Sequence, residues 1–157
     1  TSYGFQSLSC LFGKPIIDIS SPIGDMWTHN EKYLLMTKHH ILKKEKRKLS
    51  LSEIFSHGVA FASDTKIFEQ KGIALVDNTP EEIKDLVIEM AENLEFKRKL
   101  NPEDEELQKT FRNLYASNIK RYDYQKDSKN LKGFIIHGQI RARFGTKFLR
   151  ENKNWLR

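Results

Sequence analysis

The first residues of the chain have side chains and spacing that suit the binding of an anion. Thr1, Ser2 and Gly4 precede apolar residues that recur at helical spacing, Phe5, Leu8, Leu11 and Phe12. The first N–H groups of a helix have no partner within it, and the helix dipole favours negative charge there. Ser2 adds a hydroxyl donor and Gly4 lets a phosphate approach the main chain. The segment therefore predicts an anion site, beside the plainer interpretation that it only caps a helix.

A second candidate is the turn that contains Ser20 and Ser21. It follows Ile16–Ile19, a short apolar segment that we expect to be a buried strand after a helix stop at Gly13. In open α/β sheets, ligands bind outside the carboxyl ends of the strands. Ser20 and Ser21 are therefore a possible ligand-binding loop.

Histidine and cysteine do not predict a metal site or a catalytic residue. His39 and His40 are adjacent, so their side chains point in different directions, and no Cys, Asp or Glu stands at ligand spacing. None of the five histidines has a partner in the sequence that argues for catalysis. The single cysteine, Cys10, excludes an internal disulfide and fits a small core residue in a reducing compartment. We predict no metal and leave the catalytic residue unassigned.

Several segments have clear helix signals. Residues 49–58 begin with a capping box, Ser50 with Glu53, and end at Gly58. Asp64 is expected to cap a short helix that runs to Gln70. Thr79 and Pro80 begin the strongest helix, whose expected buried stripe is Ile83, Val87, Met90, Ala91 and Leu94, with Leu86 at its edge. A further helix from Pro102 has the stripe Leu107, Phe111, Leu114, Tyr115 and Ile119. The acidic residues of both helices are interpreted as solvated faces or as responses to the helix dipole.

Strand signals are weaker. Ile73–Asp77 is short, apolar and without alternation, which predicts a strand buried on both faces. Residues 33–35 are expected to form a short extended segment at the surface. Near the end, a helix after Gly138 is expected to carry Ile140, Phe144, Phe148 and Leu149 on one side. Gly145 in its middle indicates close packing against another element.

Blocks in one order along nearly the whole chain resemble a known family. They are Ser2-x-Gly4, Phe12–Pro15, Leu49–Phe55, Gly72–Ile83, Glu103–Gln108, Phe111, Gly138–Gly145 and Phe148–Arg150. The family is that of bacterial glycosyltransferases of surface-polysaccharide synthesis, which are GT-B-like, and the resemblance covers only their C-terminal part. Because the chain starts inside the Ser/Gly motif, we expect its beginning to be truncated.

The resemblance implies an α/β fold: a partial Rossmann-like parallel sheet flanked by helices, with a helix-rich C-terminal half. Residues 1–132 would belong to the nucleotide-sugar-binding domain. Residues 133–157 would be a terminal helix that crosses back to an N-terminal domain outside this chain, which would supply the general base.

In such an enzyme Thr1, Ser2 and Gly4, joined by Gln6, would hold the donor diphosphate without a metal or further cofactor. Many related enzymes place a ribose-binding glutamate where this chain has Ser7, Leu8 and Ser9, so the donor stays open. The expected partners are a nucleotide-sugar and a glycan or lipid-linked acceptor. The chain alone would be inactive.

Length, charge and hydropathy set further bounds. A chain of 157 residues fits one domain, and no apolar run approaches the roughly 18 residues of a membrane span. With no export signal at its start, the resemblance places the protein in the cytoplasm, at the inner face of a bacterial membrane. The net charge of +6 is uneven, with basic clusters at residues 38–48 and 141–150. The alternative functions are therefore a basic, non-catalytic domain that binds nucleic acid or an anionic membrane, and an inactive structural fragment.

Overall fold

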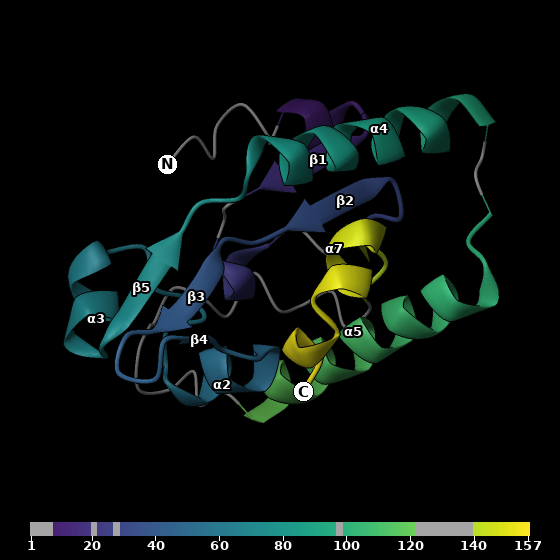
Figure 1. The fold of residues 1–157 in the computed structure, drawn as a ribbon. Helices are drawn as coiled ribbons and strands as arrows, with labels where there is room; N and C mark the ends of the chain where they lie inside the picture. Colours follow the sequence, from purple (N-terminus) through teal and green to yellow (C-terminus); the bar gives the residue numbers. More distant parts are fainter. Residues whose placement is uncertain (1–7, 20–21, 27–28, 97–98, 122–139) are drawn as a thin grey trace.

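The computed structural model describes residues 8–19, 22–26, 29–96, 99–121 and 140–157. Its first sheet is parallel and consists of β1 (Ile16–Ile19), β2 (Tyr33–Met36) and β6 (Arg143–Phe144), in that spatial order. The long helices α4 (Pro80–Phe96) and α5 (Pro102–Arg121) run on opposite sides of this sheet in Figure 1. The short helix α7 (Thr146–Glu151) lies between them and contacts both.

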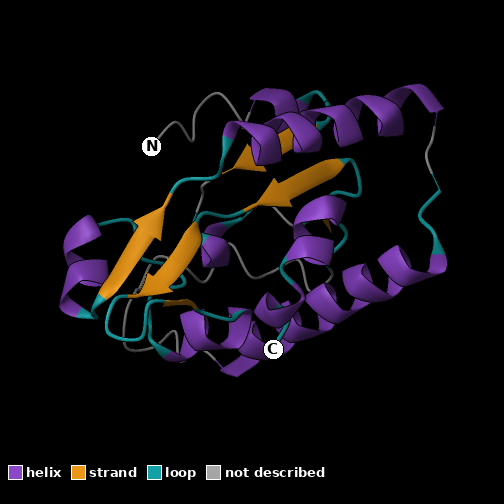
Figure 2. Ribbon diagram, in the orientation of Figure 1, coloured by secondary structure: helices purple, strands orange, loops and turns teal. Residues whose placement is uncertain are grey.

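The second sheet is antiparallel. It consists of β3 (His39–Leu42), β4 (Arg47–Lys48) and β5 (Ile73–Val76), in the order β4-β3-β5. β2 leads almost directly into β3, so the two sheets are neighbours in Figure 2. The remaining elements are short: η1 (Ile23–Asp25), α2 (Leu51–Ser56), α3 (Thr65–Gln70) and η3 (Lys153–Trp155). The predicted mixed α/β class, with a small parallel sheet flanked by helices, is confirmed.

The core is built around β2, which corrects one prediction. Tyr33, Leu34, Leu35 and Met36 are at most 1% exposed, although the sequence suggested an extended segment at the surface. β2 is paired with β1 on one side and with β6 on the other, so both of its edges and both of its faces are covered. The partner strand β6 lies far along the chain, and no local pattern indicates it.

Strand β5 exists as predicted, but the predicted burial on both faces is wrong. It pairs antiparallel with β3 alone, with His40 opposite Leu75. Leu75 is 38% exposed and Val76 is 48% exposed. The short apolar run therefore belongs to a half-exposed edge strand.

The predicted starts of α2, α3, α4 and α5 are confirmed, because their signals are local. The predicted capping box is formed in α2: Ser50 Oγ accepts from Glu53 N, and Glu53 accepts from Ser50 N. Asp64 caps α3 as expected. Phe111 and Tyr115 of α5 are buried, and Leu107, Leu114 and Ile119 pack against the core.

The predicted buried stripe of α4 is wrong in its rotation about the helix axis. Ile83, Val87 and Leu94 are 38%, 49% and 56% exposed. The buried residues are Met90, which the predicted stripe contained, Leu86, which was expected at its edge, and Glu89, which was not expected to be buried. Glu89 is buried because its carboxylate accepts hydrogen bonds from Thr146 N and Thr146 Oγ1 at the start of α7. A solvated acidic face was therefore the wrong interpretation for this residue.

The expected terminal helix is also divided differently. Arg143 and Phe144 form a strand, and the helix starts only at Thr146, with Gly145 as its N-cap residue. The close packing predicted at Gly145 is confirmed, since a Cβ there would lie 2.7 Å from Leu86 Cδ1. Phe144, Phe148, Leu149 and Trp155 join the common core. Residues 133–139 lie outside the described residues, and the crossing to another domain stays a prediction.

Candidate functional site

Two neighbouring strands of the parallel sheet end at the same edge. Ile19 of β1 is paired with Met36 of β2, the last residue of each strand, so the carboxyl ends of the two strands lie side by side. The predicted ligand loop, Ser20 and Ser21, directly follows β1 but lies outside the described residues. Ligands of open α/β sheets bind at this edge. The side chains that follow β2 are therefore candidates for a functional site.

The predicted diphosphate site also lies outside the described residues, since Thr1, Ser2, Gly4 and Gln6 all precede residue 8. The described end of that segment agrees with the expected helix stop: residues 8–11 are helical, and Gly13 has a φ of 61°. Cys10 packs against the core, with its Sγ 3.5 Å from His29 Nε2.

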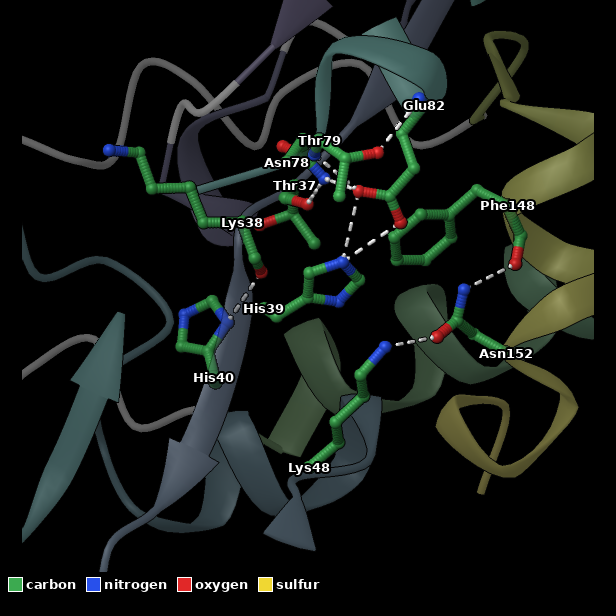
Figure 3. Close-up of polar contacts among 10 residues, drawn as sticks. All are labelled: Thr37, Lys38, His39, His40, Lys48, Asn78, Thr79, Glu82, Phe148 and Asn152. Carbon is green, nitrogen blue, oxygen red and sulfur yellow. Dashed lines mark hydrogen bonds and ion pairs between the residues drawn. The ribbon is translucent and has the colours of Figure 1, made fainter. Parts of the chain in front are cut away.

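At the carboxyl end of β2, the structure forms a histidine–carboxylate pair that sequence reasoning missed. His39 Nε2 lies 2.9 Å and 3.2 Å from the two carboxylate oxygens of Glu82 (Figure 3). The side chains are 10% and 16% exposed. His39 is the first residue of β3, and Glu82 lies in the first turn of α4. The pair therefore connects the antiparallel sheet to the helix that packs on the parallel sheet. The sequence indicated no partner for any histidine, and the structure shows that His39 has one in Glu82.

Glu82 is held in place by the start of its own helix. Its Oε2 accepts from Thr79 N at 2.9 Å, and Thr79 Oγ1 accepts from Glu82 N at 3.1 Å, which is a capping box. Asn78 Nδ2 donates to Thr37 O at 3.0 Å and so ties this loop to the end of β2. Burial raises the pKa of Glu82, but the Thr79 N–H and the contact with His39 outweigh it, so the pKa is lowered overall. Glu82 is therefore ionised at neutral pH.

The ring of His39 is fixed from the other side by α7. It stacks on Phe148 with a centroid distance of 5.5 Å and an interplanar angle of 14°. Asn152 Nδ2 donates to Phe148 O, and Lys48 Nζ donates to Asn152 Oδ1 at 2.8 Å. Figure 3 shows Lys48 and Asn152 on the side of the His39 ring away from Glu82. Three elements distant in sequence thus meet at one imidazole.

His40 points away from this pair, as expected for adjacent strand residues. Its ring contacts Phe68 of α3 at a centroid distance of 5.8 Å, and its Nδ1 lies 3.0 Å from Lys38 O. Burial lowers the pKa of His40 to about 4, with a smaller lowering from His39 and a partial offset from the bond to Lys38 O. His40 is neutral at pH 7 and belongs to the packing of β3.

The two basic clusters of the sequence meet at an open groove of about 890 Å³. Arg47 and Lys48 line one side of it, and Arg150, Lys153 and Arg157 line the other. Most of these cations already have a carboxylate: Arg47 pairs with Glu45 and Glu53, Arg150 with Asp104, and Lys153 with Glu103. The groove is therefore far less positive than its lysines and arginines suggest.

Within the described ranges, no three His, Cys, Asp or Glu side chains gather as metal ligands would. None of the described helices combines the length and apolar character needed to cross a bilayer. No family model, curated protein or solved structure matches this chain.

Proposed function

We propose that this chain is the C-terminal, donor-binding part of a glycosyltransferase that moves a sugar from a nucleotide-sugar to an acceptor hydroxyl in bacterial surface-polysaccharide synthesis. The structural observation that supports it best is the strand order β1-β2-β6, all parallel and in chain order. Half of a doubly wound nucleotide-binding sheet has this arrangement. It agrees with the resemblance carried by the blocks along the chain.

In this proposal the donor diphosphate is bound by Thr1, Ser2 and Gly4 at a helix N-terminus, with Gln6 beside them. Ser20 and Ser21 contribute from the carboxyl edge of the sheet. As the glycosidic bond to the diphosphate breaks, negative charge builds on the leaving phosphate. Main-chain N–H groups directed at that phosphate stabilise the charge. The partners are a nucleotide-sugar and a glycan or lipid-linked acceptor.

A second candidate is a basic domain that binds nucleic acid or an anionic membrane. The observation in its favour is that the two basic clusters share one groove. The observation against it is that Lys38, Arg47, Lys147 and Arg150 each form an ion pair with a carboxylate of the chain. A cation that is already paired gains less from a phosphate, because the first pair must be broken. We therefore rank this function second.

The deciding experiment is calorimetric titration of the full-length protein with UDP and a panel of UDP-sugars, and in parallel with duplex DNA and anionic vesicles. We expect UDP to bind, and Gly4→Val to abolish binding because the added side chain blocks the main chain. Ser56→Ala, on an exposed position of α2, is the matched control and should leave binding unchanged.

Salt separates the two candidates. Binding of UDP should persist from about 50 mM to about 300 mM salt, whereas binding to a phosphate backbone should fall by orders of magnitude over that range. Tight, salt-sensitive binding of DNA or vesicles without any binding of UDP would overturn the glycosyltransferase proposal.

A further inference from the structure

A cavity of about 440 Å³ lies at the amino edge of the parallel sheet, beside the C-terminal half of α4 (Figure 1). Pro15 directly precedes β1, Tyr33 and Arg143 are the first residues of β2 and β6, and Met90 and Leu94 belong to α4; all five line the cavity. Its volume falls within the range of about 300–1,000 Å³ that is usual for small-molecule sites. This edge is opposite to the carboxyl edge, so the cavity is distinct from the region assigned to the nucleotide-sugar.

Most of the cavity wall is apolar. Leu34 and Met90 are buried and form its inner part, whereas Leu94 is 56% exposed. An exposed leucine that lines a cavity offers apolar surface that a ligand withdraws from water. The wall therefore suits a ligand with an apolar body.

The charged group of the wall that lacks a counter-ion is Arg143. Its side chain is half-buried, and it forms no ion pair with a carboxylate in the described part of the chain. Arg47 and Arg150, in contrast, each pair with a carboxylate. A guanidinium that is partly withdrawn from water is stabilised by an anion, and it binds a carboxylate through two parallel N–H donors. The ligand is therefore expected to carry an anionic group.

The remaining polar groups of the wall limit the charge of that ligand. Lys32 is exposed, and its Nζ donates to Gly13 O at 3.5 Å. Glu31 is exposed and brings a negative charge to the cavity, and Asn93 adds an uncharged amide. The Glu31 carboxylate repels a phosphate dianion more than a singly charged carboxylate. A monoanion fits this set of groups better than a phosphate.

We propose that this cavity binds a small organic monocarboxylate with an apolar body. The carboxylate lies on Arg143, and the apolar body packs against Leu34, Met90 and Leu94. This function goes beyond the proposed sugar transfer and does not depend on it, because every residue that carries it is described and lies at the opposite edge of the sheet.

The test uses 3-phenylpropionate as the probe and follows nitrogen-15 NMR spectra of the full-length protein during titration. We expect the amide signals of residues 31–34, 90–94 and 143 to shift, with a dissociation constant on the order of 1 mM, as is usual for a ligand of this size. The amide 3-phenylpropanamide has the same shape without the charge, and acetate has the charge without the apolar body. Each should bind at least about 10-fold more weakly.

Two pairs of variants test the two halves of the site. Arg143→Gln should weaken binding of 3-phenylpropionate by about 10-fold, to the level of the amide, whereas Arg112→Gln, at a half-buried arginine of α5 outside the cavity, should leave it unchanged. Leu94→Asn should weaken binding by about 3-fold or more. Ile88→Asn, at a residue of α4 that is 47% exposed and outside the cavity, is its matched control. Because Leu94 is largely exposed, its substitution tests the site even where Arg143→Gln disturbs the fold.

Each contrary outcome is specific. Equal binding of 3-phenylpropionate and 3-phenylpropanamide would overturn the role of Arg143, and acetate or inorganic phosphate that binds as tightly as 3-phenylpropionate would overturn the apolar half of the site. No shift of the named signals up to about 20 mM probe would overturn the whole proposal. None of these results depends on whether the protein binds UDP.

Discussion

Gln108 of α5 pairs with the main chain of Phe144 through both ends of its side-chain amide. Nε2 donates to Phe144 O at 2.6 Å, and Oε1 accepts from Phe144 N at 3.0 Å. Gln108 is fully buried. β6 is only two residues long and has β2 on one side, so the amide of Gln108 occupies the place of a further strand partner. One side chain thus completes the hydrogen bonding of the third parallel strand.

Gln108→Leu should destabilise the protein strongly. Leucine fills a similar volume but forms no hydrogen bonds, so two buried main-chain groups of Phe144 lose their partners. The free energy of unfolding should fall by roughly 2–4 kcal/mol. Urea denaturation followed by circular dichroism measures it. Gln70→Leu, at an exposed position at the end of α3, is the control and should change stability little. Equal effects of the two substitutions would contradict the role given to Gln108.

The contact of Asp104 with Arg150 gives a second prediction. The Asp104 side chain is 1% exposed, and both of its oxygens accept from the guanidinium of Arg150. Asp104→Asn should cost about 1–3 kcal/mol, because it weakens the contact of a buried carboxylate with Arg150, whose side chain is 40% exposed and so partly screened by water. Glu105→Gln, one residue further along α5 and exposed, should cost less than about 0.5 kcal/mol.

A double-mutant cycle tests the same contact more directly. Asp104→Asn in the background of Arg150→Met should cost less than in the wild type, by at least about 1 kcal/mol. Additive effects would show that Asp104 stabilises the start of α5 through the helix dipole alone, which was the interpretation from the sequence.

The sequence predicted those parts of the fold whose causes are local. The capping residues Ser50, Asp64 and Thr79 each mark a helix start that the structure contains, because a cap involves only the next three residues. The apolar run at residues 73–76 predicted a strand for the same reason. Local sequence does not show which strand pairs with it, however, and that pairing decides how much of the strand is exposed.

The errors share one physical cause, which is pairing between residues far apart in the chain. β2 is buried because β6 pairs with it, and Glu89 faces inward because it binds Thr146. The candidate site is of the same kind. Glu82 was correctly interpreted as a capping residue, yet its carboxylate also binds His39, and nothing around residue 39 in the sequence signals that contact.

His40 predicts a loss of stability in mild acid. Its pKa is lowered from 6.5 to about 4 by burial, so the unfolded chain binds the proton more readily than the folded one. The stabilisation of the folded chain that comes from the neutral, buried His40 is complete above pH 6.5, and it declines as the pH falls from 6.5 toward 4. Between pH 7.5 and pH 5 the free energy of unfolding should fall by about 2 kcal/mol from this group.

Replacing His40 with Gln removes the titrating group and should flatten that part of the pH dependence, whatever it does to stability at pH 7.5. His57→Gln is the control and should keep the wild-type slope. The measurement is urea denaturation at several pH values. An unchanged slope in the His40→Gln variant would show that other groups cause the acid sensitivity.

Gly145 gives the last prediction, because its tolerance is set by space and not by backbone conformation. Its φ of −48° and ψ of 118° are open to any residue. A Cβ at this position would lie 2.7 Å from Leu86 Cδ1, and Leu86 is only 3% exposed, so its side chain has little room to move. Gly145→Ala should therefore cost about 1–3 kcal/mol as overpacking.

Leu86→Ala removes the atom in conflict, so Gly145→Ala should be nearly neutral in that background. The coupling between the two substitutions, measured by urea denaturation, should reach at least about 1 kcal/mol. Additivity would mean that α7 shifts away from α4 to accept the methyl group, and the geometry that places Phe148 against His39 would then be adjustable.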